Sequence, residues 1–368
     1  MAASARPSVG RRRRGFGMRH RLGAGAAMCA AALLIAQPAP AIVSGNADFN
    51  RKHYLRLATD PEFRYGNEFG SVAYDPAFSS VGQIYGERAG GAFAASGVLI
   101  DDHWVLTAAH VTAGATQLRF WLDSGGTNFS RPGYLLADRV LTHPLWQGQL
   151  NAGYDLGLFH LSAPAACLAA GTCAAADFDE DAIAPANQAL AVQVGFGRTG
   201  VGRYGADSFD GLKRAGTNQL DAYYPNSQNN ILLADFDSGR ARDNYYGTTT
   251  RTVMEAIVAP GDSGGALFDA EGELLGITSF IWGLDGNSNS DFGDVGGWSR
   301  VAFYREWIDC VLAGSAVCGS STFGAVTVGA VEGLLNRARV PEPSVLVLFG
   351  LALAGLLAGH LANASRLA

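Results

Sequence analysis

The chain has 368 residues, of which 48% are hydrophobic and 16% charged, a composition that supplies a sizeable core and excludes a disordered polyampholyte. Its 48 glycines follow no Gly-X-Y period, which excludes a collagen-like triple helix and assigns the excess to turns. Seven of the 27 basic residues precede position 42, where no Asp or Glu occurs; the remaining 20 face 33 acidic residues, and this net −13 disfavours binding to nucleic acid.

Residues 1–41 have the organisation of a secretory signal peptide. A basic region ends at Arg21, an apolar run covers residues 25–36, and Ala-Pro-Ala ends at Ala41, the kind of site that signal peptidase cleaves. A membrane anchor is the alternative, but the apolar run is too short to span a bilayer. Arg13-Arg14 also resembles a twin-arginine signal, so the export route stays open between the two pathways.

Short apolar and β-branched runs separated by Gly, Asn and Asp follow the leader. They predict strands at residues 97–100, 104–107, 117–122, 190–195, 266–268 and 274–281. Short strands joined by turns favour an all-β fold of packed sheets or closed barrels. One amphipathic helix is predicted at residues 301–312, with Val301, Tyr304, Ile308, Val311 and Leu312 on its apolar face and Trp307 beside it.

Three segments of this region carry chemistry: Leu-Thr-Ala-Ala-His ending at His110, Tyr-Asp-Leu around Asp155, and Gly-Asp-Ser-Gly-Gly around Ser263. Together, in the order His, Asp, Ser, they resemble the trypsin/chymotrypsin-like serine proteases. That resemblance implies two packed six-stranded antiparallel β-barrels with the active site between them and a C-terminal helix. It places the protease domain at residues 42–318.

The chemistry explains the residue types. A serine hydroxyl is a weak nucleophile until an imidazole takes its proton, and the imidazole needs a carboxylate to fix its tautomer. His110 is therefore the expected base, Asp155 its orienting carboxylate and Ser263 the nucleophile. Glycine beside Ser263 lets the N–H groups of Gly261 and Ser263 converge on the developing oxyanion.

The resemblance also implies a primary pocket for the residue before the scissile bond. The position six before the nucleophile forms its base, which here is Ile257. Its wall positions are Ser279, Phe280, Ile281 and Gly296. A lysine or arginine side chain would find no charged partner against Ile257, so we expect a preference for apolar or small residues.

Activation is implied by the same resemblance. Signal cleavage after Ala41 exposes Ile-Val-Ser-Gly, starting at Ile42, which resembles the Ile-Val-Gly-Gly start of mature family members. In that family the freed α-ammonium pairs with the aspartate before the catalytic serine, which here is Asp262. We expect signal peptidase itself to activate the enzyme, unless the true start lies downstream of Ile42.

Four cysteines remain after the leader: Cys167, Cys173, Cys310 and Cys318. In an exported chain they predict two disulfides, with Cys167–Cys173 and Cys310–Cys318 the shortest of three possible connectivities. The acidic stretch 285–294 lacks the Gly and Glu that an EF-hand loop requires, so a solvated loop is favoured over calcium binding, and the stretch 177–181 is interpreted in the same way. No metal or cofactor is expected.

The C-terminal residues have the organisation of a sorting signal. A linker at residues 319–343 ends in Pro-Glu-Pro, and the following 344–368 include 21 residues, 345–365, without a charge, enough to cross a bilayer as a helix. This arrangement resembles PEP-CTERM tails, which an exosortase removes. It implies an exported protein at the cell surface or beyond, held in the membrane transiently or stably.

Two functions fit these features. The first is an exported serine endopeptidase that hydrolyses polypeptide substrates. The second is a non-catalytic protease homologue that serves as a surface adhesion module, because a fold alone does not give activity. The presence of all three triad residues favours the enzyme.

Overall fold

The computed structural model describes residues 42–45, 52–179, 189–226, 228–314 and 318. Strands dominate this part and the helices are few and short, which confirms the predicted all-β class. The leader 1–41, the linker 319–343 and the tail 344–368 lie outside the described residues. Within the described part, no helix is both long and apolar enough to cross a membrane.

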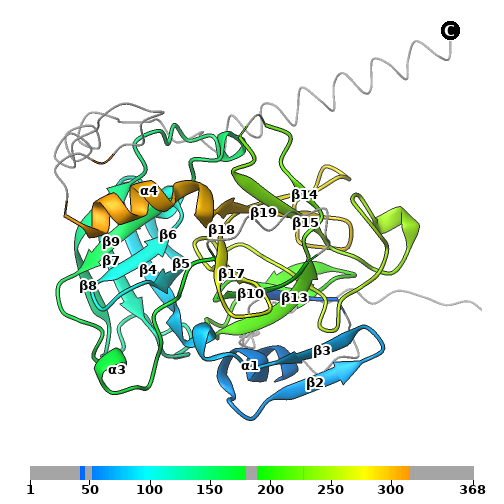
Figure 1. Ribbon diagram of the computed structural model, residues 1–368, viewed down its shortest axis with the longest axis horizontal. Helices are drawn as coiled ribbons and strands as arrows, with labels where there is room; N and C mark the ends of the chain where they lie inside the picture. The colour runs from blue at the N-terminus through cyan, green and yellow to red at the C-terminus, as the bar shows by residue number, and fades with distance from the viewer. Residues whose placement is uncertain (1–41, 46–51, 180–188, 227, 315–317, 319–368) are drawn as a thin grey trace, which may run out of the picture. The chain divides into compact units, whose positions relative to one another are not determined.

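Six strands of the N-terminal half form a closed antiparallel barrel (Figure 1), in the order β4-β5-β6-β9-β8-β7. Ile84, Val98, Leu106, Phe120 and Phe159 are fully buried in its core, so hydrophobic burial holds the ring together. The strands predicted at residues 97–100, 104–107 and 117–122 correspond to β5, β6 and β7 of this barrel. The strands are β4 Val81–Arg88, β5 Gly91–Leu99, β6 Trp104–Thr107, β7 Ala115–Trp121, β8 Leu135–Thr142 and β9 Gly157–Leu161.

The C-terminal half is a half-barrel built on one sheet of seven strands, in the order β13-β10-β17-β18-β19-β15-β14. Figure 1 shows β10, β13, β17 and β18 to the right of β7, β8 and β9. Its strands are β10 Leu190–Gly195, β13 Arg214–Gln219, β14 Ala222–Tyr223, β15 Ile231–Asp235, β17 Ala266–Phe268, β18 Leu274–Trp282 and β19 Val295–Arg300. Strands predicted at residues 190–195, 266–268 and 274–281 are confirmed.

This second half differs in detail from the expected closed ring of six strands. The short strand β14 pairs with the edge of β15, so that edge does not form a ladder with β13. The Asn218 side chain on β13 instead donates to the Asp235 carbonyl at 2.9 Å. A second sheet, in the order β12-β11-β1-β16, contains β1 Ile42–Ser44, β11 Thr199–Val201, β12 Gly205–Ser208 and β16 Ala256–Ile257.

The remaining elements are short apart from one helix. α4 is the predicted helix, Val301–Leu312, and buries Val301, Tyr304, Trp307, Ile308 and Val311. Among the described residues the others are α1 Lys52–Thr59, α2 Ala109–Thr112, α3 Ala166–Ala169, the hairpin β2 Arg64–Asn67 with β3 Gly70–Ala73, and turns of 3-10 helix at Pro76–Ser80, Leu150–Ala152 and Ala241–Asp243.

Two disulfides tie down the chain at separate places. Cys167 is bonded to Cys173 and Cys310 to Cys318. These are the two short closures predicted from the sequence, and the second joins α4 to the segment that follows it. Disulfides persist in oxidising compartments, so both bonds are consistent with an exported chain.

Candidate active site

His110 and Asp155 meet because the barrel pairs the strands beside them. β6 and β9 are antiparallel, with Thr107 opposite Gly157, so the residues just after β6 and just before β9 lie at the same edge. Asp155 Oδ2 lies 2.7 Å from His110 Nδ1, and Asp155 Oδ1 accepts the His110 backbone N–H at 2.8 Å. This double contact fixes both the ring and its backbone.

The Asp155 carboxylate is fully buried, whereas the His110 side chain is 30% exposed. Ser279 Oγ donates to Asp155 Oδ2 at 2.6 Å, and Ser299 Oγ donates to the Asp155 carbonyl at 2.8 Å. The resemblance predicts Ser279 in the pocket wall, but Ser279 lies where the ladder of β18 with β19 shifts register, between Thr278 and Phe280. Irregularities of this kind re-aim side chains, and here the hydroxyl supports the carboxylate.

The loop that carries Ser263 packs on the strand that leads to His110. The Ser263 carbonyl accepts the Ser96 N–H at 2.9 Å, which ties the loop to β5 of the first barrel. Gly264 has φ +81°, and a Cβ there would lie 1.9 Å from Thr107 Oγ1. Only glycine allows this approach, and Thr107 is three residues before His110. The structure therefore brings the serine loop against the barrel edge that holds the His–Asp pair.

The backbone around Ser263 offers two N–H groups. Gly261 has φ +99°, and its Cα approaches Gly197 so closely that a Cβ would lie 2.9 Å from the Gly197 Cα. Within the described ranges, the N–H groups of Gly261 and Ser263 donate to no protein acceptor. Free amides in a glycine-held turn are the arrangement that oxyanion stabilisation requires.

Asp262 lies in this turn and is 1% exposed. Its Oδ1 accepts the Gly197 N–H at 2.7 Å and its Oδ2 accepts the Ala259 N–H at 2.8 Å. Burial raises the pKa of Asp262 to about 7, while these two bonds and the positive charge of Arg214 oppose the rise. A carboxylate in such a place gains from a cation.

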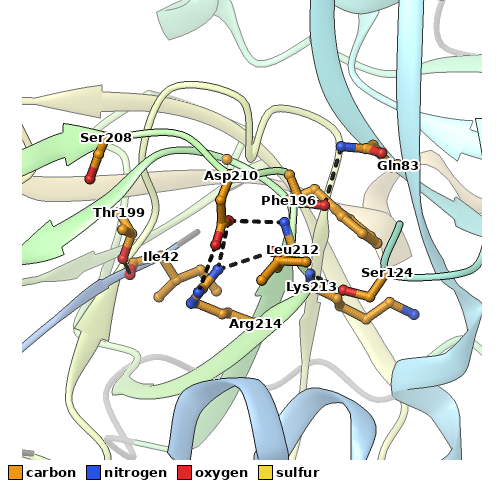
Figure 2. A network of polar contacts seen from close by, with 12 residues as sticks. Ile42, Gln83, Ser124, Phe196, Thr199, Ser208, Asp210, Leu212, Lys213 and Arg214 are labelled. Atoms are coloured by element: carbon orange, nitrogen blue, oxygen red, sulfur yellow. Dashed lines mark hydrogen bonds and ion pairs between the residues drawn. The ribbon is translucent and has the colours of Figure 1, made fainter. Parts of the chain in front are cut away.

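Ile42 lies on the strand that neighbours this region. β1 runs parallel to β11 with Ile42 opposite Thr199, two residues from the Gly197 whose N–H binds Asp262. Figure 2 shows the Thr199 hydroxyl, which donates a hydrogen bond to the Ile42 carbonyl. The same view shows the ion pair of Asp210 and Arg214. That pair is bidentate, at 3.1 and 3.2 Å, and both side chains are buried.

The predicted pocket residues do not all share one face. Ile281 is paired with Gly296 across β18 and β19, so these two lie together. Phe280 points to the opposite face, where its ring covers Gly297, because neighbouring residues of a strand alternate. Ile257 is fully buried on β16, opposite Val43 of β1.

Acidic side chains gather at two places outside the Ser263 turn. In the stretch 285–294, Asp285 accepts the Asn287 N–H and Asp294 accepts the Ser290 N–H, so both carboxylates serve their own loop. A different trio, Asp179, Asp269 and Glu273, has ligand atoms within 4.8 Å of one another. Asp269 Oδ1 in that trio accepts the backbone N–H groups of Glu271 and Glu273.

Sequence reasoning missed two features of the site. One is the third hydrogen bond on the Asp155 carboxylate, donated by the Ser279 hydroxyl, which the Gly-Ile-Thr-Ser strand motif could have suggested. The other is the buried ion pair of Arg214 with Asp210. Their spacing of four residues was visible, but nothing in the local pattern indicated that both charges would lie inside the fold.

Buried carboxylates elsewhere in the second half give the fold a pH dependence. Burial raises the pKa of Asp237 to about 8 and those of Asp221 and Asp294 to about 7. Neighbouring negative charges add to each rise, Asp235 for the first two and Asp291 for the third. Below these values the folded protein holds protons that the unfolded chain releases above about pH 4.

We therefore expect stability to fall as pH rises from about 4 to about 8. The three pKa values rise from 3.8 to about 7 or 8. Because solvent screens partly exposed carboxylates, we count the three rises together as about two pKa units, which corresponds to about 2.7 kcal/mol. Tm at pH 5 should therefore exceed Tm at pH 8 by roughly 5–10 °C. Thermal unfolding of the full chain with Ser263→Ala, which prevents autolysis, measures this difference. Asp237→Asn should flatten the profile, and a Tm that is constant or rises with pH contradicts the assignment.

The fold has a β-barrel and a β half-barrel. A buried aspartate contacts a histidine, and a serine lies in a turn that requires glycines. These features together define a protein of the chymotrypsin-like class. Residues 69–308 match the family described as Trypsin, so the chain belongs to the trypsin family, and it is a serine endopeptidase. It is 26% identical over 238 residues to chymotrypsin-like elastase family member 1 of Rattus norvegicus, covering 59% of this chain and 78% of that protein.

Two further similarities cover comparable shares of the chain. Scolexin B of Heliothis virescens is 28% identical over 228 residues, which covers 58% of this chain and 73% of that protein. A solved structure titled HL collagenase is 18% identical with a TM-score of 0.46, covering 66% of this chain and 96% of that one.

Proposed function

We propose that this chain is an exported endopeptidase that cleaves polypeptides through an acyl-enzyme, with His110, Asp155 and Ser263 as its triad. The observation that carries the proposal is the buried Asp155 carboxylate, which holds His110 by two hydrogen bonds at 2.7 and 2.8 Å beside the Ser263 loop. A carboxylate bonded to Nδ1 leaves Nε2 as the nitrogen that accepts a proton.

In the proposed reaction, Ser263 Oγ attacks the substrate carbonyl carbon as His110 Nε2 takes the hydroxyl proton. The N–H groups of Gly261 and Ser263 stabilise the oxyanion. Protonated His110 then gives its proton to the leaving amine, and the C–N bond breaks. Water, activated by His110, next hydrolyses the ester and restores the serine.

Export and activation belong to the same proposal. The signal-like leader and the two disulfides support removal of residues 1–41 by signal peptidase. The freed Ile42 ammonium then pairs with Asp262, whose buried carboxylate gains from a cation. The PEP-CTERM-like tail supports membrane contact and removal by an exosortase-like protease, which leaves the enzyme at the cell surface or outside the cell.

Labelling with a small fluorophosphonate tests the catalytic proposal. We expect the matured protein to form a stoichiometric adduct on Ser263, because a small phosphonate needs only an activated serine and an oxyanion site. Ser263→Ala should abolish the adduct, and His110→Ala should slow labelling by about three orders of magnitude or more. Intact-mass measurement and peptide mapping give the extent and the position.

The matched control is His160→Ala. His160 also lies 2.7 Å from an aspartate, Asp138, but on the exposed face of the barrel, so its loss should leave labelling unchanged. A correctly matured protein that takes up no phosphonate would instead be the surface adhesion module considered above.

A further inference from the structure

A buried tryptophan packs against the segment that leads into the Ser263 turn. Trp298 on β19 is fully buried. A Cβ at Gly296, two residues earlier on the same face, would lie 2.6 Å from Cη2 and 3.2 Å from Cζ2 of the indole. The outer edge of the indole therefore rests directly on the Gly296 backbone.

This indole lies among the segments that flank the nucleophile. Trp298 packs in one hydrophobic cluster with Ile257, Val258 and Ala259, and the half-buried Ile281 packs against the same cluster. Thr278 is paired with Trp298 across the sheet. Its backbone also exchanges hydrogen bonds of 2.8 and 2.9 Å with Gly264 and Gly265, directly after Ser263.

Two polar groups in this apolar surrounding have no protein partner. In the part of the chain that the structure describes, the Trp298 Nε1 donor and the Thr278 Oγ1 hydroxyl are buried and make no hydrogen bond. A buried polar group without a partner costs about 1–3 kcal/mol. A long aliphatic or aromatic guest would leave both groups unpaired, whereas a small side chain leaves room for its own hydroxyl or for a water.

We propose that Trp298, with Ile281 opposite Gly296, restricts the primary pocket to small residues, so that the enzyme cleaves after Ala, Ser or Gly and rejects Leu, Phe and Tyr. This inference rests on the proposed serine endopeptidase mechanism. It narrows the preference for apolar or small residues expected from Ile257, because the indole occupies the depth that a large apolar side chain would need.

A series of peptide p-nitroanilides that differ only in the residue before the scissile bond measures the effect. We expect kcat/KM for Ala to exceed that for Phe by about 100-fold or more, the scale on which a pocket of fixed size discriminates. Trp298→Phe removes the indole edge that covers Gly296. It should raise cleavage after Leu relative to Ala by about 10-fold or more.

Trp121→Phe is the matched control, because Trp121 is a tryptophan of the first barrel with 1% exposure and its loss should not move the Ala-to-Leu ratio. Ile281→Ala provides a second test at a less buried position, in case Trp298→Phe does not fold. It should shift the ratio in the same direction.

Two results would overturn the inference: equal cleavage after Ala and Phe by the unaltered enzyme, or an unchanged ratio in the folded Trp298→Phe and Ile281→Ala variants. Fluorophosphonate labelling separates this failure from failure of the mechanism. An enzyme whose Ser263 is labelled but which cleaves after Phe retains the mechanism and contradicts only the pocket inference.

Discussion

Asp155→Asn should lower kcat by about 10⁴-fold, the scale on which loss of a triad carboxylate acts. The Asp155 carboxylate receives hydrogen bonds from the His110 backbone, the His110 ring and the Ser279 hydroxyl, at 2.8, 2.7 and 2.6 Å. An asparagine has one acceptor oxygen, so its NH₂ group must face a donor. When the NH₂ group faces His110 Nδ1, that nitrogen must accept a hydrogen bond and the imidazole proton lies on Nε2. In this tautomer Nε2 cannot accept the Ser263 proton.

The measurement is kcat on a peptide ester or anilide, with the concentration of competent enzyme fixed by active-site titration. Asp138→Asn is the control, since Asp138 holds His160 at the same 2.7 Å but on the surface, and activity should stay within about twofold. Ser279→Ala removes one of the three donors and should cost far less than the aspartate. A loss below about tenfold in Asp155→Asn would contradict the assignment of Asp155 as the triad carboxylate.

The sequence predicted the parts of this site that are local. Gly-Asp-Ser-Gly-Gly requires glycines because Gly261 and Gly264 adopt φ of +99° and +81°, and this requirement can be read from a pentamer. Strands and the helix at residues 301–312 were equally visible, since their apolar periodicity is set within each segment.

What the sequence could not predict depends on register and on long-range packing. The shift that turns Ser279 toward Asp155 lies in the pairing of β18 with β19, which no single segment encodes. The Trp298 indole covers Gly296 only because both project from the same face of one strand into the cluster around Ile257. The open edge of the seven-stranded sheet follows from the two-residue strand β14, which is too short to give a periodic signal.

Replacement of Asp262 by asparagine should reduce kcat/KM by about 10²–10³-fold in a folded protein. Both carboxylate oxygens accept backbone N–H groups, from Gly197 and Ala259, and Ala259 begins the turn that presents the Gly261 N–H. Asparagine can satisfy one of these donors and opposes the other with its own NH₂ group. Loss of one oxyanion donor alone costs two to three orders of magnitude in rate.

Asp269→Asn is the matched control, because Asp269 is also a buried aspartate that accepts two backbone N–H groups, those of Glu271 and Glu273. Its replacement should affect stability and leave kcat/KM nearly unchanged. If both variants lose activity equally, the loss reflects general destabilisation of the fold rather than disorder of the oxyanion turn.

The pairing of Asp262 with a free Ile42 ammonium needs a separate comparison, since the asparagine variant loses the backbone bonds as well. A form that begins at Ile42, verified by N-terminal sequencing, should be about 100-fold or more as active as a form with residues retained before Ile42, because only the former supplies a cation. Removing one side of a buried ion pair costs about 3–5 kcal/mol. The freed ammonium should also lower the pKa of Asp262 from about 7, so the mature form should keep its activity at lower pH. Full activity in the extended form would show that the bonds from Gly197 and Ala259, with the nearby charge of Arg214, hold Asp262 without the N-terminus.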